Sequence, residues 1–179
     1  MSPSPWQMSL QQWTARQNRP PRVAVLGIGN SLRSDDAAGV LVARRLAQSR
    51  LTRDFDSILV VDAGPAPENT TAGLRRFAPE LVLLIDAAEM GELPGMIREI
   101  GIHEIDGLSA STHSLPLSML AKYLILELGC EVKILGIQPQ SIEIGNSVSD
   151  DVLLAVGEIT AGLLESLPEI LTLEPDSLN

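Results

Sequence analysis

Cysteine and aromatic residues are scarce in this sequence, and each shortage excludes a class of protein. Cys130 is the only cysteine among 179 residues, so neither an intramolecular disulfide nor a cysteine-based zinc site can form. Aromatic residues make up 3% of the chain, which disfavours the stacking platforms that bind single-stranded nucleic acid. Because Cys130 precedes an apolar run, we expect it to be a small buried residue rather than a nucleophile.

Basic residues and long hydrophobic runs are also lacking. The chain has 13 Lys and Arg against 23 Asp and Glu, a net charge of −10, which disfavours nucleic acid and anionic membrane as partners. No segment approaches the roughly 18 consecutive apolar residues of a membrane-spanning helix, and no signal peptide is visible. We therefore expect a cytoplasmic protein without membrane insertion.

The apolar residues that make up 45% of the chain form short runs, which alternate between strand-like and helix-like patterns. This alternation predicts an α/β fold with three layers, in which helices flank both faces of a mostly parallel, twisted sheet. We expect one domain over residues 22–172, an N-terminal extension over 1–21 and a C-terminal tail over 173–179. The expected strands are 23–26, 58–61, 81–85, 132–137 and an edge strand at 96–100. The expected helices are 37–47, 69–77, 117–128 and 149–166.

In the N-terminal extension, Trp6 and Trp13 lie seven residues apart and could share one face of a helix. The extension then either packs on the domain or stays mobile.

Polar residues follow the carboxyl ends of four expected strands, where ligands bind in open parallel sheets. A carboxylate at the rim of an apolar core is costly unless another group pairs with it. These residues are therefore candidates for a functional site. They are the segment Asn30–Asp36, Asp62, Asp86 and Gln138.

The glycines Gly27 and Gly29 after the first strand do not indicate a dinucleotide site. Leu32 occupies the position of the third glycine, and the carboxylates of Asp35 and Asp36 would compete with a phosphate for the helix N-terminus. Capping of the following helix explains one of these two acids, and we assign that role to Asp35.

The sequence has two histidines, which differ in their surroundings. His113 lies just before Pro116 at the expected start of a helix, where the helix dipole disfavours the imidazolium and leaves the neutral form that binds metals. His103 lies in an acidic, turn-like stretch, and we expect it to be exposed and without function. Two carboxylates and one imidazole would form a mixed oxygen and nitrogen set that suits nickel, zinc, manganese or iron.

Four motifs, taken in order, resemble those of the hydrogenase maturation endopeptidases. They are Gly27-Ile-Gly-Asn-Ser-Leu-Arg-Ser-Asp-Asp36 followed by Gly39, then Asp62-Ala-Gly64, Leu84-Ile-Asp-Ala87 and Thr112-His113, with Gly136-Ile-Gln-Pro139 as a further match. The resemblance covers about residues 23–166.

The resemblance implies an aspartic-type endopeptidase that removes a short C-terminal peptide from a nickel-loaded hydrogenase large-subunit precursor. It implies Asp36, Asp86 and His113 as the catalytic and metal-contacting residues, with nickel carried by the precursor rather than held tightly by the protease. The surrounding loops would support these residues. The alternative is a nickel-dependent binding or checkpoint protein of the same fold that does not cleave. The supporting loop residues are Gly29, Asn30, Asp35, Asp62 and Gln138.

Overall fold

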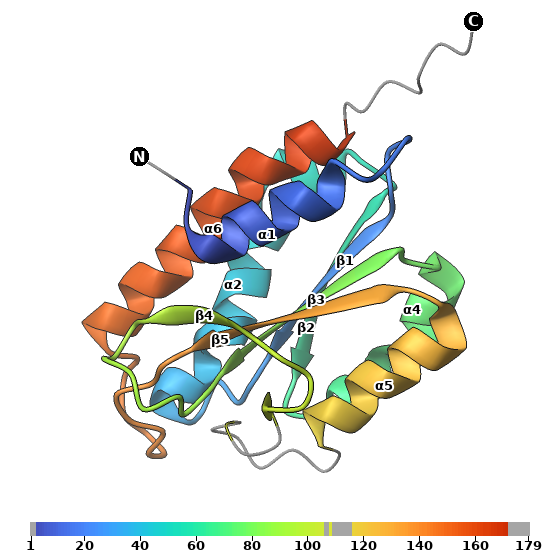
Figure 1. The fold of residues 1–179 in the computed structure, drawn as a ribbon. Coiled ribbons are helices and arrows are strands. Elements are labelled where there is room, and N and C mark those ends of the chain that lie inside the picture. The colour runs from blue at the N-terminus through green and yellow to red at the C-terminus, as the bar shows by residue number, and fades with distance from the viewer. Residues whose placement is uncertain (1–2, 106–107, 109–115, 172–179) are drawn as a thin grey trace, which may run out of the picture.

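A computed structural model describes residues 3–105, 108 and 116–171 (Figure 1). At its centre is a five-stranded sheet in the order β2-β1-β3-β5-β4. The first four strands in this order run parallel, and β4 pairs with β5 in the antiparallel direction at one edge. The strands are β1 (Val23–Ile28), β2 (Ile58–Gly64), β3 (Leu81–Ala87), β4 (Ile97–Ile100) and β5 (Glu131–Ile137).

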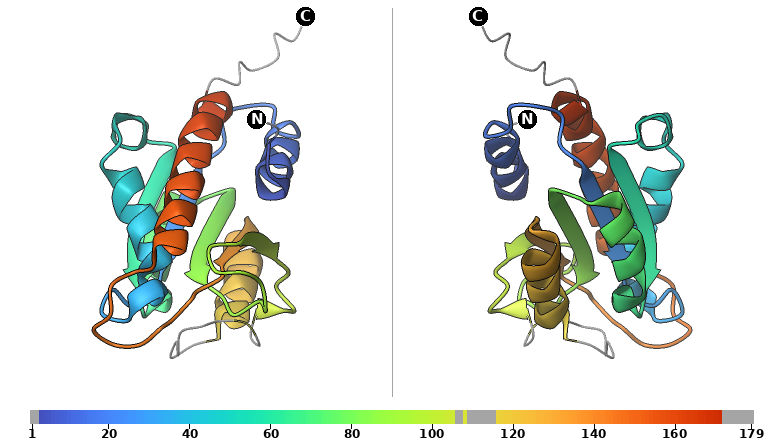
Figure 2. Two further views of the ribbon diagram at one scale, coloured as in Figure 1. Left: turned by 90° about the vertical axis from the view of Figure 1, so that its left-hand side faces the viewer. Right: turned by 90° about the vertical axis from the view of Figure 1, so that its right-hand side faces the viewer.

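Helices cover both faces of this sheet (Figures 1 and 2). Alternate strand residues point to opposite faces, so Val23 and Val25 of β1 join one core cluster while Ala24 and Leu26 join the other. The three-layer α/β architecture expected from the sequence is confirmed. The first cluster contains α1 (Pro5–Thr14), α2 (Ala38–Ala47) and α6 (Asp150–Leu171); the second contains α4 (Thr71–Phe77) and α5 (Leu117–Leu128).

The observed elements extend beyond the expected ones at the carboxyl ends of the strands. Asp62 and Asp86 lie within β2 and β3 rather than after them, because main-chain pairing continues regardless of side-chain polarity: Asp62 pairs with Gly27, and Asp86 with Gly136. The helix expected from residue 37 begins instead with a short 3-10 turn, η1 (Ser34–Ala37). A short helix, α3 (Arg50–Arg53), and a second 3-10 turn, η2 (Pro67–Thr70), were not expected.

The N-terminal segment forms a helix that contributes to the main core. Trp6, Leu10 and Trp13 lie on one face of α1, and all three are buried in the cluster that α2 and α6 share. Figure 1 shows α1 running beside α6, with which it is in contact. The shared helix face expected for the two tryptophans is therefore observed.

Among the helices of the described residues, none combines the length and the apolar character that a bilayer crossing requires. Residues 173–179, the expected tail, lie outside the part of the chain that the structure describes.

Substitution of a core residue in α1 tests whether this helix stabilises the fold. Leu10 is 2% exposed, so Leu10→Ala should lower the free energy of unfolding by about 2–5 kcal/mol, through lost burial and the cavity left behind. Met8, 43% exposed on the same helix, provides the control, and Met8→Ala should change stability by only about 0.5 kcal/mol. Urea unfolding of both variants measures the difference. Equal losses would mean that α1 does not pack on the core in solution.

Candidate functional site

Two glycines let α2 approach the sheet closely at the carboxyl ends of β1 and β3. A Cβ atom on Gly27 would lie 2.1 Å from the carbonyl oxygen of Gly39. A Cβ atom on Gly39 would lie 2.0 Å from the carbonyl oxygen of Ile85 and 2.5 Å from that of Ile28. Any larger side chain would push the start of α2 outward. The segment that precedes α2, which contains both acids of the first motif, is thereby held against the ends of two strands.

Asp36 lies in η1 and is fully buried. One of its carboxylate oxygens, Oδ2, accepts a hydrogen bond of 3.0 Å from the main-chain N–H of Asn30. Gly29 makes this arrangement possible, because its φ is +127° and a Cβ atom there would lie 1.8 Å from the carbonyl oxygen of Asp36. Asn30 in turn shapes the loop, since its Oδ1 accepts a hydrogen bond of 3.0 Å from the N–H of Leu32. Gly29 and Asn30 thus set the position of Asp36.

Asp86 is the second fully buried acid at this edge of the sheet. It follows Ile85 in β3, the central strand, and its main chain pairs with Gly136 of β5. The turn η1 is in contact with β3, so the segments that carry Asp36 and Asp86 meet at one rim. Two buried carboxylates at one rim would be complementary to a bound cation.

The third member of the expected set, His113, lies outside the described residues. Within the part of the chain that the structure describes, no group of three or more His, Cys, Asp or Glu side chains could hold a metal ion. The described site therefore consists of two acids.

Asp35 does not cap α2, contrary to the expectation from the sequence. Its buried carboxylate instead accepts hydrogen bonds from the loop that follows β5 and from the residue just before α6. The donors are the N–H of Gln140 at 2.8 Å, the N–H of Ser141 at 3.1 Å, and both the N–H and the hydroxyl of Ser149, at 2.7 and 3.0 Å. The three N–H groups belong to a segment more than 100 positions away, which the local capping pattern could not reveal.

The segment 140–149 is a part of the site that the sequence motifs did not indicate. Besides Asp35, three neighbours hold it: the Ser34 hydroxyl donates to the carbonyl oxygen of Ser147 at 2.9 Å, and Arg33 Nε donates to the carbonyl oxygen of Ile142 at 3.3 Å. The N–H of Gly145 in turn donates to the carbonyl oxygen of Leu32 at 3.1 Å. Ser34 has a φ of +41°, a conformation that costs energy in a residue other than glycine. The only signal in the sequence is its turn-forming composition, including Gly145, Asn146 and Ser147.

Gln138 organises the loop that follows β3. Its side chain is buried, and Oε1 accepts hydrogen bonds from the N–H groups of Met90 at 2.7 Å and Glu92 at 3.2 Å. Its Nε2 donates to Glu89 Oε1 at 2.8 Å and to the carbonyl oxygen of Pro139 at 3.1 Å. This side chain joins the loops that follow β3 and β5.

Asp62 differs from the two buried acids in being exposed. Its exposed carboxylate forms an ion pair with Arg44 of α2, in which Nε lies 2.7 Å from Oδ2. An ion pair this exposed contributes little to stability. The partner that the structure gives the Asp62 carboxylate is thus Arg44, and Asp62 does not share the burial of Asp36 and Asp86.

Cys130 and His103 occupy the surroundings expected for them. Cys130 is 4% exposed, and burial raises the pKa of its thiol, while a hydrogen bond with the main chain acts in the opposite direction. A buried thiol of raised pKa makes a poor nucleophile at neutral pH. His103 is exposed.

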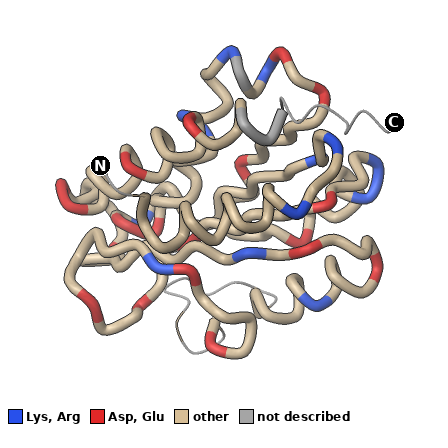
Figure 3. Tube along the Cα trace, turned by 45° about the horizontal axis from the view of Figure 1, so that its top comes forward, with Lys and Arg blue, Asp and Glu red and all other residues tan. Residues whose placement is uncertain are grey.

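Acidic and basic residues are interspersed along the described chain. Figure 3 shows Lys and Arg positions distributed among several elements, with Asp and Glu between them. The acids of the site are distinguished from the other acidic residues by their burial.

Comparison with known proteins identifies relatives over most of the chain. The family model described as hydrogenase maturation protease, HycI, matches residues 40–166. A Methanocaldococcus jannaschii protein assigned as a hydrogenase maturation protease is 33% identical over 153 residues, which cover 83% of this chain and 90% of that protein. The Escherichia coli K12 hydrogenase 3 maturation protease is 38% identical over 119 residues, which cover 66% of this chain and 73% of the enzyme.

Solved structures agree with these sequence matches. The crystal structure of a [NiFe] hydrogenase maturation protease HycI from Thermococcus kodakarensis KOD1 superposes with a TM-score of 0.77 at 29% identity, covering 89% of this chain and 99% of that one. A crystal structure of the hydrogenase 3 maturation protease gives a TM-score of 0.69 at 33% identity, covering 79% of this chain and 88% of that one.

Removing the charge of Asp35 tests its structural role. The Asp35 carboxylate accepts hydrogen bonds from four donors, and Asp35→Asn would place an amide NH₂, itself a donor, among them. We therefore expect a loss of about 2–4 kcal/mol in the free energy of unfolding. Asp56, an exposed acid just before β2, is the control, and Asp56→Asn should change stability by about 0.5 kcal/mol or less. Equal unfolding midpoints in guanidinium chloride for the two variants would refute the assigned role.

Proposed function

Because this chain belongs to the hydrogenase maturation protease family, we propose that it removes a short C-terminal peptide from a nickel-loaded hydrogenase large-subunit precursor. The family supports a peptidase that processes a hydrogenase precursor. The observation that carries the finer proposal is the pair of fully buried acids, Asp36 and Asp86, at one rim of the sheet.

In this proposal, nickel enters the site as part of the substrate. Carboxylate oxygens together with an imidazole nitrogen suit borderline divalent ions, so the chemistry of Asp36, Asp86 and His113 fits nickel. Nickel would supply positive charge next to the two acids and the scissile carbonyl when the loaded precursor is bound. A precursor without nickel would bring no positive charge to the two acids, which would weaken its binding. The two acids thereby select the loaded precursor.

Peptide hydrolysis also requires a group that accepts a proton from the attacking water, and we assign this to Asp36. A carboxylate accepts the water proton as the oxygen attacks the scissile carbonyl carbon, and it returns a proton to the departing nitrogen as the C–N bond breaks. This makes the enzyme aspartic in type. The hydrogen bond from Asn30 to Oδ2 orients the Asp36 carboxylate for this transfer. The thiol of Cys130, buried and of raised pKa, is not a rival nucleophile.

The charge of Asp86 should be required for processing but not for folding. Asp86→Asn keeps the size of the side chain and removes the charge that would face nickel, so cleavage of a nickel-loaded precursor should fall at least about a hundredfold. The melting temperature should change by only a few degrees, because the substitution keeps the size of the side chain. A gel shift of the precursor measures cleavage, and calorimetry measures melting.

Asp56→Asn again provides the charge-matched control, because Asp56 is exposed and lies just before β2, at the opposite end of that strand from the rim. It should cleave at the wild-type rate. If Asp86→Asn also cleaves at that rate, the site assignment is wrong. If wild-type protein binds the loaded precursor without cleaving it, the protein acts as a nickel-dependent checkpoint instead. If Asp86→Asn unfolds the chain, Asp86 is a structural residue.

A further inference from the structure

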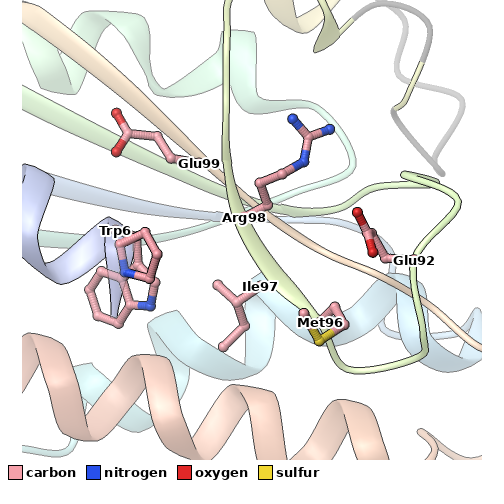
Figure 4. A pocket seen from close by; sticks show the side chains of 7 residues that line it. Trp6, Glu92, Met96, Ile97, Arg98 and Glu99 are labelled. Carbon is pink, nitrogen blue, oxygen red and sulfur yellow. The ribbon is translucent and has the colours of Figure 1, made fainter. Parts of the chain in front are cut away.

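A groove lies between α1 and the edge strand β4, on the α1 side of the sheet. It has a volume of about 360 Å³, within the range of ligand pockets. Figure 4 shows Trp6 of α1 opposite Ile97 of β4, with Met96 and Glu92 towards one end. The full lining is Pro5, Trp6, Glu92, Met96, Ile97, Arg98 and Glu99.

Among the described residues, β5 is the only strand that pairs with β4, which therefore forms an edge of the sheet. Gly95, which has a φ of +80°, donates its N–H to the carbonyl oxygen of Gln138. The N–H of Gln138 donates in turn to the carbonyl oxygen of Met96. These bonds form a G1 bulge and fix which β4 residues pair with β5. Because pairing alternates along an antiparallel ladder, Arg98 faces β5, and the main-chain N–H and C=O groups of Ile97 and Glu99 face outward. An outward row of such groups is a template for another strand.

Trp6 supplies a second, independent feature of the groove. Its side chain is 4% exposed, yet its indole Nε1 has no hydrogen-bond partner among the described residues. A buried N–H group without an acceptor costs free energy, and a ligand that brings a carbonyl oxygen would recover it. The groove therefore combines an apolar wall, an unused buried donor and an open strand edge, which together are complementary to an extended peptide.

We infer that this groove binds an extended segment of the hydrogenase precursor as an added strand beside β4, an inference that rests on the proposed function. The segment would exchange main-chain hydrogen bonds with Ile97 and Glu99, and one of its carbonyl oxygens would accept the N–H of Trp6. Such pairing is insensitive to side-chain identity, so it holds a peptide in register without dictating its sequence.

The groove leads to the rim that carries the two acids. Its Met96 end adjoins Gln138, which also holds the loop containing Glu92. Gln138 follows β5 directly, next to the strand that ends in Asp86 and Ala87. A peptide paired with β4 would therefore run towards the site. The groove thus fits the part of the precursor that must reach the acids.

A second copy of this chain is a poorer occupant. β4 is only four residues long, so pairing between two such edges would join only a few residues of each copy. Stable interfaces bury roughly 1,200–2,000 Å², far more than two such short strands provide. One extended segment fits a groove of about 360 Å³ better than a folded partner does.

Two pairs of variants test the inference through the kinetics of precursor cleavage. Glu99→Pro removes the outward N–H of β4 and leaves the main-chain bonds to β5 intact, whereas Glu99→Ala keeps that N–H. Both variants lose the ion pair of Glu99 with Lys133 of β5, so the comparison isolates the N–H. Trp6→Phe removes the unused donor, and Trp13→Phe makes the same chemical change at the other tryptophan of α1. We expect Glu99→Pro and Trp6→Phe each to raise KM about fivefold or more over their matched controls, with kcat unchanged. Circular dichroism and urea unfolding establish that all four variants are folded.

The outcomes separate this inference from the proposed function. If wild-type protein cleaves the nickel-loaded precursor and all four variants share its KM, the groove does not bind the precursor although the function stands. If wild-type protein does not cleave the nickel-loaded precursor, the proposed function is wrong, and the inference that rests on it is wrong as well. Sedimentation that shows a wild-type dimer and a monomeric Glu99→Pro variant would overturn the inference, because a second copy would then occupy the edge. An unfolded Glu99→Pro variant leaves the decision to the tryptophan pair.

Discussion

The close approach of α2 to the sheet is the constraint on which the site depends. Gly27 and Gly39 remove the side chains that would otherwise hold the helix away from β1 and β3. The turn before α2 must then fit against the strand ends, and Gly29 adopts a φ of +127° to leave room for the main chain of Asp36. An acid from the first motif and an acid from β3 therefore come to one buried rim. Backbone packing, rather than any attraction between the two carboxylates, brings them together.

The adjacent acids of the first motif have different tasks, although both are fully buried. Asp35 accepts four hydrogen bonds from the segment 140–149 and links it to the first loop, so its charge is offset by donors of the protein. Asp36 receives the N–H of Asn30 at one oxygen and lies next to β3. The hydrogen bonds of Asp35 hold the loop beside Asp36, so they limit how far Asp36 can move, as the proposed catalytic role of Asp36 would require.

The sequence was sufficient for the fold and for the rim, but less so for individual roles. Apolar runs fixed the order of strands and helices, because hydrophobic periodicity reflects local geometry. The carboxyl ends of those strands then indicated where Asp36 and Asp86 would meet. The prediction that Asp35 caps α2 was wrong, because the partners of its carboxylate lie over 100 residues away and no local pattern encodes them. Asp62 occupied the expected strand end, but its exposed side chain pairs with Arg44.

The central claim is that Asp36 and Asp86 act as one unit that recognises nickel on the precursor. The most direct test compares the Kd of nickel-loaded and nickel-free precursor for wild-type protein, Asp36→Asn, Asp86→Asn and the double variant, by calorimetry. Wild-type protein should favour the loaded precursor at least about tenfold, which corresponds to about 1.4 kcal/mol. Each single variant should lose most of that preference, and the double variant should lose little more, because coupled residues do not contribute additively. An unchanged preference in both single variants would contradict the account.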